Sequence, residues 1–168
     1  DSACDLSSVL VKKYGITIVP LKIHFDNETF LDRSIKNSEF YKKMSLYDNL
    51  PKTSHPSEER FLEIYEEGDE DLIVITISSR LSSTYATASL AKLMYEENNK
   101  TRKIAVIDSE AGSAGQGQLV VLAARLAQAG RSFEDIVNII EWAKKQIIFY
   151  GVLDTLENTI KGGKVSSL

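Results

Sequence analysis

The sequence predicts an α/β fold of the Rossmann-like type, in which helices flank a mostly parallel sheet. The first observation is a pair of short apolar runs, residues 72–77 and 103–107, of the kind found in strands buried on both faces. The second is that longer segments with apolar residues at helical spacing follow each run. Strands that alternate with helices in this way pair in parallel through right-handed crossovers.

The first third of the chain predicts a hairpin and a helix. Residues 16–25 are rich in β-branched side chains and contain Pro20, which indicates two short strands, and residues 28–31 return as the partner of the second. Asn37 or Ser38 is expected to cap a helix that ends near residue 49.

The remaining elements follow in order. A loop at residues 51–57 leads into a helix that Gly68 closes, and the strand at 72–77 ends in a serine cluster. The next helix places Ala86, Leu90, Leu93 and Met94 on one face. Beyond the strand at 103–107 we expect a helix at 118–129 that is apolar on all sides and therefore buried, a helix capped by Ser132, and a last buried strand at 146–153.

Composition excludes several classes of protein. The 168 residues suffice for one sizeable core, and 43% hydrophobic with 26% charged residues is ordinary for a globular protein. A net charge of -4 without a basic stripe argues against a nucleic-acid partner. One cysteine, Cys4, and two separated histidines, His24 and His55, argue against a metal site. No window is apolar enough for membrane insertion, so we expect a cytoplasmic protein.

The serine cluster is the first candidate for a binding site. It comes where a predicted parallel strand ends and a helix begins, which is where open α/β sheets bind ligands and where backbone N–H groups favour anions. Thr53 and Ser54 enter another helix, so the two loops could converge on one carboxylate or phosphate. Because serine and threonine also cap helices, both loops could equally be caps without any ligand. The hydroxyls of the cluster are those of Ser79, Ser82, Ser83 and Thr84.

Motifs for phosphate loops and serine hydrolases are not matched. The sequence contains no GxxxxGK[ST], GxGxxG or GxSxG, and the glycines of residues 112–117 fall at the first, fourth and sixth positions of that stretch. His55 is a candidate base for the serine cluster only through its place in the sequence. A small-molecule hydrolase or transferase, and a plain interaction domain, both remain open on this reasoning.

A series of short motifs resembles the DegV family. The motifs occur in the family's order and span the chain: Asp1-Ser2 with Asp5-Leu6, Tyr14-Gly15-Ile16 with Val19-Pro20-Leu21, Pro51-Lys52-Thr53-Ser54 with Pro56-Ser57, Ile77-Ser78-Ser79 with Leu81-Ser82 and Thr84-Tyr85, Val106-Ile107-Asp108-Ser109, and Asp154-Thr155-Leu156-Glu157 ahead of Lys161-Gly162-Gly163.

The resemblance implies a non-enzymatic, cytoplasmic fatty-acid-binding protein of bacteria, without cofactor. Family members hold a long-chain fatty acid and present its carboxylate to the separate ATP-binding subunit of a fatty acid kinase, which makes acyl phosphate. The implied carboxylate ligands are Thr53 and Ser82, supported by Ser54, Ser79 and Thr84. Ser83 stands where the family usually has glycine and His55 where glutamine is common, so both could add contacts. The resemblance also implies an amino-terminal α/β domain at 1–153 and the start of a second α/β domain at 154–168, of which the larger part is missing.

Overall fold

The structure is a computed structural model, which describes residues 1–26, 28–47, 49–98, 101–148, 150, 152 and 160. Contacts divide the chain into two compact units, the first formed by residues 1–19 with 55–149 and the second centred on residues 20–54. The predicted domain boundary between residues 153 and 154 lies outside the described residues.

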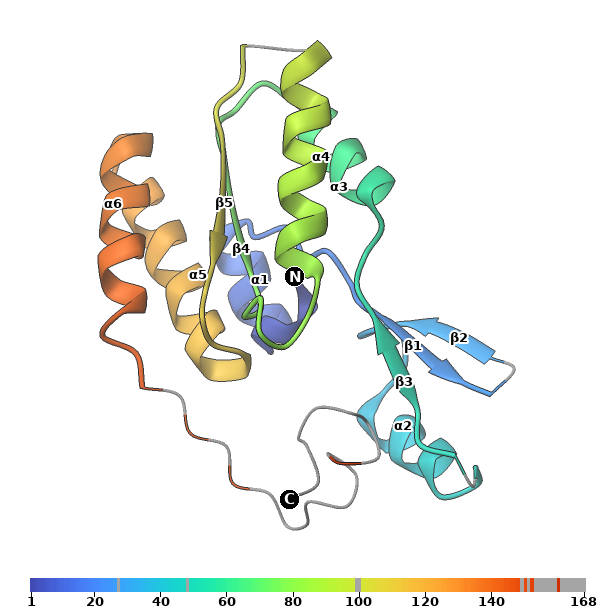
Figure 1. Cartoon of the computed structure of the whole chain (residues 1–168). Helices are drawn as coiled ribbons and strands as arrows, with labels where there is room; N and C mark the ends of the chain where they lie inside the picture. Colours follow the sequence, from blue (N-terminus) through green and yellow to red (C-terminus); the bar gives the residue numbers. More distant parts are fainter. Residues whose placement is uncertain are drawn as a thin grey trace. The chain divides into compact units, whose positions relative to one another are not determined.

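The first unit is built on a parallel strand pair. Strands β4 (Leu72–Thr76) and β5 (Ile104–Asp108) pair in register from Leu72 with Ile104 to Thr76 with Asp108 (Figure 1). This confirms the parallel sheet with flanking helices that the sequence predicts.

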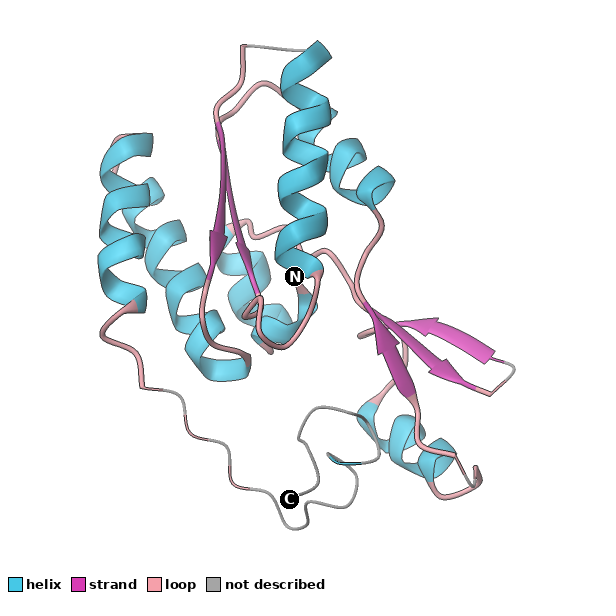
Figure 2. Ribbon diagram, in the orientation of Figure 1, coloured by secondary structure: helices cyan, strands magenta, loops and turns pink. Residues whose placement is uncertain are grey.

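Helices lie on both faces of this pair, as Figures 1 and 2 show. Helices α3 and α4 pack together on one face, whereas α5 and α6 pack together on the other. The helical elements of the unit are η1 (Ser2–Cys4), α1 (Ser8–Tyr14), α3 (Glu58–Glu66), α4 (Thr84–Asn98), α5 (Ser113–Gln128) and α6 (Phe133–Lys144).

Side-chain alternation along the strands creates two cores. Leu72 and Val74 of β4 pack into a cluster with Phe61, Tyr65 and Ala88 of α3 and α4. The alternate residues Ile73 and Ile75 pack instead into a cluster on the other face, with Leu119, Ala123, Ile136 and Ile140 of α5 and α6. Because both faces are covered, the strand sequences read as continuous apolar runs.

The second unit is a small antiparallel sheet with one helix. Strand β1 (Lys22–Phe25) lies between β2 (Glu28–Leu31) and β3 (Lys52–Ser54). Helix α2 (Asn37–Met44) supplies Phe40, which packs edge-on against Phe25 at 5.5 Å between ring centroids. The predicted hairpin is confirmed as β1 and β2.

Several local predictions are wrong. Residues 16–20 have no regular secondary structure, and residues 52–54, predicted as a loop, form β3. Helix α2 ends at Met44 because Ser45 and Leu46 already form a turn, and Lys36 rather than Asn37 or Ser38 occupies its cap position. Residues 146–148 of the predicted last strand form a turn and coil, and part of that strand lies outside the described residues.

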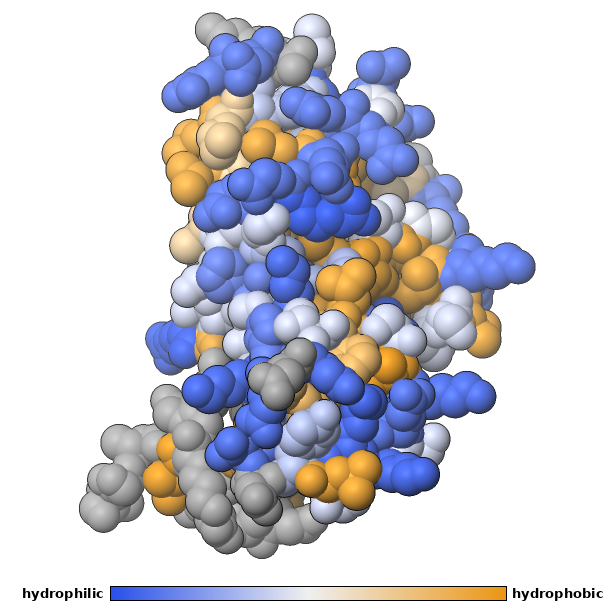
Figure 3. Space-filling view, turned by 90° about the vertical axis from the view of Figure 1, so that its right-hand side faces the viewer, coloured by the Kyte–Doolittle hydropathy of each residue, from blue (hydrophilic) through white to orange (hydrophobic). Residues whose placement is uncertain are grey.

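Two helices are less buried than their sequences suggest. In α5 the small residues Gly115, Gly117 and Ala123 face the core, whereas its opposite side is partly exposed. In α4 the side chains of Leu90, Leu93 and Met94 are exposed. Figure 3 shows one side of the molecule, on which apolar side chains lie among polar ones. No helix of the described residues has the length and apolar character needed to cross a bilayer.

Candidate functional site

The serine loop, residues 77–83, connects the carboxyl end of β4 to the first residue of α4. Its backbone turns sharply because the N–H groups of Leu81 and Ser82 both donate to the Ser78 carbonyl, at 2.9 and 3.1 Å. The Ser78 hydroxyl accepts from the Arg80 N–H at 3.3 Å. Ser78 is thereby committed to holding the turn, whereas Ser79 and Ser83 are exposed.

Ser82 and Thr84 form the central pair of the loop. Their hydroxyl oxygens are 2.9 Å apart, and the Ser82 hydroxyl accepts from the Thr84 N–H at 3.3 Å. Thr84 is fully buried and Ser82 is half-buried, so Ser82 is the member of the pair that a ligand can reach. If the Thr84 hydroxyl donates to Ser82, both acceptor positions of Ser82 are used and its own O–H points to an external acceptor.

A second loop, which follows β5, holds the serine loop from one side. The Ser78 N–H donates to the Ala111 carbonyl at 2.8 Å, and the Ser79 N–H donates to the Asp108 carboxylate at 3.1 Å. Ser109 hydrogen bonds back to Thr76 of β4 at 3.2 Å. The sequence placed Asp108 in a family motif but predicted no role for it. Ser79 and Asp108 are 29 residues apart, and no local sequence pattern indicates a bond between them.

His55 lies against the first turns of α4. Its Nδ1 is 2.9 Å from the Pro56 carbonyl and 3.1 Å from the hydroxyl of buried Thr87. Thr87 follows Thr84 by three residues and therefore lies on the same side of the helix. The structure brings His55 to the helix that the serine loop begins, but shows no bond from His55 to a serine hydroxyl.

Thr53 and Ser54 belong to the second unit and point to opposite faces of its sheet. Ser54 shares a face with His24, whose Nε2 is 2.8 Å from the Ser54 hydroxyl and whose Nδ1 is 2.9 Å from the Thr29 hydroxyl. Thr53 is paired with Ile23, and successive residues of a strand alternate between faces. The two neighbouring hydroxyls are therefore not presented in one direction. The contact between His24 and Ser54 was not foreseen, since it depends on the strand register.

Charge at the serine loop is sparse. Arg80 is the single cationic side chain of residues 77–84 and is exposed. The loop offers instead hydroxyl groups and the amino-terminal end of α4, a helix of 15 residues whose dipole favours anions there. No three His, Cys, Asp or Glu side chains gather as metal ligands in the part of the chain that the structure describes. The arrangement is therefore suited to a small anion such as a carboxylate, whose hydration the hydroxyl groups can replace.

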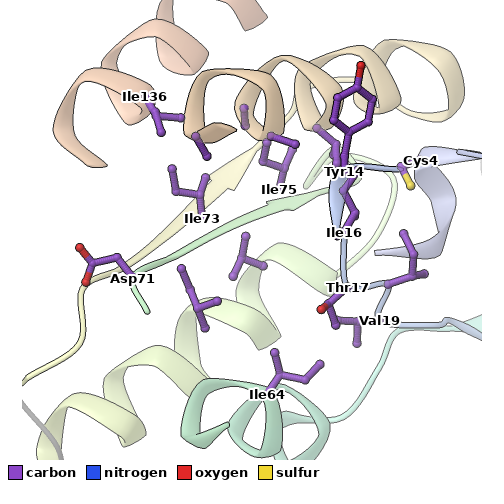
Figure 4. A pocket seen from close by; sticks show the side chains of 18 of the residues that line it. Cys4, Tyr14, Ile16, Thr17, Val19, Ile64, Asp71, Ile73, Ile75 and Ile136 are labelled. Carbon is purple, nitrogen blue, oxygen red and sulfur yellow. The ribbon is translucent and has the colours of Figure 1, made fainter. Parts of the chain in front are cut away.

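A separate cavity of about 640 Å³ opens beside β4 in the first unit. It runs between β4 and residues 14–19 and reaches α5 and α6; Figure 4 shows Ile73, Ile75 and Ile136 along it, with Asp71 and Cys4 toward opposite ends. None of the predicted carboxylate ligands lines it. The cavity is lined mostly by apolar residues, and none of them belongs to the serine loop.

Comparison with known proteins gives the family. A sequence model described as "Uncharacterised protein, DegV family" matches residues 1–168. The chain belongs to the DegV family. A DegV domain-containing protein of Clostridium acetobutylicum is 37% identical over 169 residues, which cover 98% of this chain and 59% of that protein. A similar protein of Lactococcus lactis is 35% identical, covering 100% of this chain and 60% of that protein.

Solved structures of proteins described by their fatty-acid ligands resemble this chain. A DegV family protein of Ruminococcus gnavus with vaccenic acid has a TM-score of 0.80 and 30% identity, covering 86% of this chain and 52% of that chain. A stearic acid-binding protein of Eubacterium ventriosum has a TM-score of 0.76 and 33% identity, covering 84% and 50%. The Streptococcus pneumoniae Fatty Acid Kinase B3 protein, loaded with linoleic acid, has a TM-score of 0.71 and 30% identity, covering 76% and 45%. This chain thus spans about half the length of these structures.

Proposed function

We propose that this DegV protein binds a long-chain fatty acid and holds its carboxylate through the serine loop. The observation that carries the proposal is the pair of Ser82 and Thr84, in which a buried hydroxyl supports an accessible one at the start of a helix. Similar structures with vaccenic, stearic and linoleic acid support the choice of ligand.

The geometry divides the proposed contacts by role. Ser82 donates to the carboxylate, Thr84 orients Ser82 from behind, and the exposed hydroxyls of Ser79 and Ser83 add donors at the rim. His55 is held by its Nδ1, which leaves Nε2 as its contact to the carboxylate or to a bound water. Family resemblance assigns Thr53 to the same carboxylate, with Ser54 in support, and this part of the proposal rests on sequence.

The energies are consistent with such a carrier. A hydrogen bond to a charged group contributes about 1.5–3 kcal/mol, and each buried methylene of the acyl chain contributes about 0.8 kcal/mol. The acyl chain therefore supplies most of the affinity, and the hydroxyls fix the position of the carboxylate.

We further propose that the carrier is non-catalytic and presents its fatty acid to a separate ATP-binding kinase subunit. In that step a carboxylate oxygen attacks the γ-phosphorus of ATP, and acyl phosphate and ADP are formed on the partner. Neutral hydroxyl donors leave the carboxylate more nucleophilic than a bidentate arginine would. The name of the streptococcal Fatty Acid Kinase B3 protein supports this assignment.

The test is native mass spectrometry of the full protein purified from a bacterial host, with identification of the lipid released on denaturation. We expect one fatty acid per chain, retained in wild type and largely lost in the Thr53→Ala, Ser82→Ala double variant. Ser132→Ala is the matched control, because Ser132 also caps a helix, with its hydroxyl accepting from the Asp135 N–H at 3.2 Å. A protein that is empty and takes up no added oleate would refute the proposal.

A second candidate function, acyl hydrolysis, is favoured by the 2.8 Å distance between His24 Nε2 and the Ser54 hydroxyl. This distance suits a nucleophile and its base. The third group is the neutral Thr29 hydroxyl rather than a carboxylate, which provides weaker support for an imidazolium. A fluorophosphonate probe distinguishes the two candidate functions. Labelling of wild type but not of Ser54→Ala would favour a hydrolase over a fatty-acid carrier.

A further inference from the structure

Carboxylates anchor the serine loop at two points. Asp1 Oδ2 accepts from the Ile77 N–H at 2.7 Å, where the loop begins, and Asp108 at the carboxyl end of β5 holds the loop two residues further on. Asp108 is the last residue of β5, and its Oδ1 accepts from two N–H groups, that of Ser79 at 3.1 Å and that of Glu110 at 2.9 Å. One carboxylate oxygen therefore joins the serine loop to the loop that follows β5.

The connection from Asp108 to the first residue of α5 is itself strained. Glu110 and Ser113 both have positive φ angles, 54° and 48°, which non-glycine residues rarely adopt. Lys144 of α6, with its side chain 11% exposed, donates to the Asp108 carbonyl at 3.2 Å and pairs with Glu110 at 3.3 Å. Contacts thus run continuously from α6 through Asp108 to the serine loop.

The Asp108 carboxylate lies directly beside the loop that is proposed to receive an anion. A carboxylate beside a loop that receives an anion disfavours that anion, and the neutral amide of asparagine could accept the same bond. What Asp108 supplies to the loop is therefore the acceptor that fixes Ser79, next to the turn at Ser78 that places Ser82.

We propose that Asp108 is a positioning residue for the fatty-acid carboxylate: through the Ser79 N–H it sets the direction of the serine loop and hence of Ser82. This inference rests on the proposed function. It names a role for a residue that contacts no ligand itself.

The same sheet contains a control for the structural role. At the opposite end of the strand pair, the Asp71 carboxylate accepts from the Lys103 N–H at 2.9 Å, which is the same type of bond across the same two strands. Asp71→Ala removes an equivalent bond far from the serine loop. The comparison of Asp108 with Asp71 therefore separates loop positioning from general strand pairing.

The experiment measures displacement of a fluorescent fatty acid by oleate in the full protein, for wild type, Asp108→Ala, Asp108→Asn and Asp71→Ala. We expect Asp108→Ala to weaken oleate binding tenfold or more, Asp108→Asn to restore affinity to within threefold of wild type, and Asp71→Ala to stay within twofold. Should Asp108→Ala not fold, Asp108→Glu replaces it, because one added methylene moves the acceptor away from Ser79. Equal affinity of wild type and Asp108→Ala, equal loss in Asp108→Asn, or equal loss in Asp71→Ala would overturn the inference.

Hydrogen–deuterium exchange reads the positioning without a ligand. We expect faster exchange of residues 78–82 in Asp108→Ala than in Asp71→Ala, and near wild-type exchange in Asp108→Asn. Failure of wild type to bind oleate overturns the proposed function, whereas unchanged exchange in Asp108→Ala overturns the positioning role alone.

Discussion

Arg102 is expected to be the polar side chain on which the stability of the first unit depends most. It is 7% exposed, and its guanidinium donates to backbone carbonyls at the end of α3 and just beyond it: to Ile64 at 3.5 Å, to Tyr65 at 2.9 Å, to Glu67 at 2.8 Å, and to Glu70. The last carbonyls of a helix lack partners within the helix, and a cation there also interacts favourably with the helix dipole.

The magnitude of an Arg102→Met substitution follows from these contacts. Methionine keeps most of the side-chain stem but removes every donor. Glu67 and Glu70 are exposed, so their carbonyls regain water, whereas the carbonyl of buried Tyr65 loses a charge-assisted bond and is left unpaired. A buried group left without its partner costs about 1–3 kcal/mol, and the remaining bonds add about 0.5–1.5 kcal/mol each, so the total is at least about 2 kcal/mol.

Urea unfolding followed by circular dichroism measures this loss as a fall in the free energy of unfolding at an unchanged m-value. Arg125→Met is the control, because Arg125 is an exposed arginine at the end of α5, and surface substitutions usually change stability by less than about 0.5 kcal/mol. An Arg102→Met protein within 1 kcal/mol of wild type would show that the contacts do not stabilise the unit as reasoned.

Three further predictions concern packing, titration and the site. Gly117→Ala should destabilise by about 1–3 kcal/mol in urea unfolding, because the new Cβ lies 2.6 Å from the Cys4 carbonyl oxygen; an unchanged midpoint would refute the close approach. Burial raises the pKa of Tyr65, whose neutral hydroxyl donates to the Ala88 carbonyl. The free energy of unfolding should therefore keep this contribution below pH 10, the ordinary pKa of tyrosine, and lose it as the pH rises further. In Tyr65→Phe the free energy of unfolding should fall less steeply with pH, and identical pH profiles of the two proteins would contradict this. Thr53→Ala should weaken oleate binding more than Ser54→Ala, because the Ser54 hydroxyl is already bonded to His24; the reverse order in a displacement assay would argue against the assigned roles.

The parts of the fold that could be predicted from sequence are those fixed by local pattern. Residues 72–77 and 103–107 predict buried strands because both faces of each run are apolar. Ser132 predicts the start of a helix because serine is a preferred cap residue, and its hydroxyl does cap α6. The wrong predictions of secondary structure concern segments whose conformation depends on contacts with distant parts of the chain. Residues 52–54 look like a loop, yet they form a strand because β1 offers an edge, with Ile23 opposite Thr53.

The same division applies to the site. The hydroxyls of the serine loop could be located from composition and from the place where a strand ends. What could not be predicted is which hydroxyl is buried, since Ser82 in the loop and Thr84 at the start of α4 are two residues apart and have similar side chains. The contact of His24 with Ser54 depends on strand register, and that of Asp108 with Ser79 depends on the approach of two segments distant in the sequence. Neither can be predicted from a single sequence.

The central claim, that hydroxyl groups of the serine loop hold a fatty-acid carboxylate, is tested most directly by NMR of the full protein with palmitate labelled with ¹³C at the carboxyl carbon. The account predicts one sharp carboxyl resonance, displaced from that of palmitate in vesicles, that shifts or broadens in Ser82→Ala and stays in place in Ser132→Ala. A bound-palmitate resonance that is identical in wild type and Ser82→Ala would contradict it, because the carboxylate would then lie elsewhere.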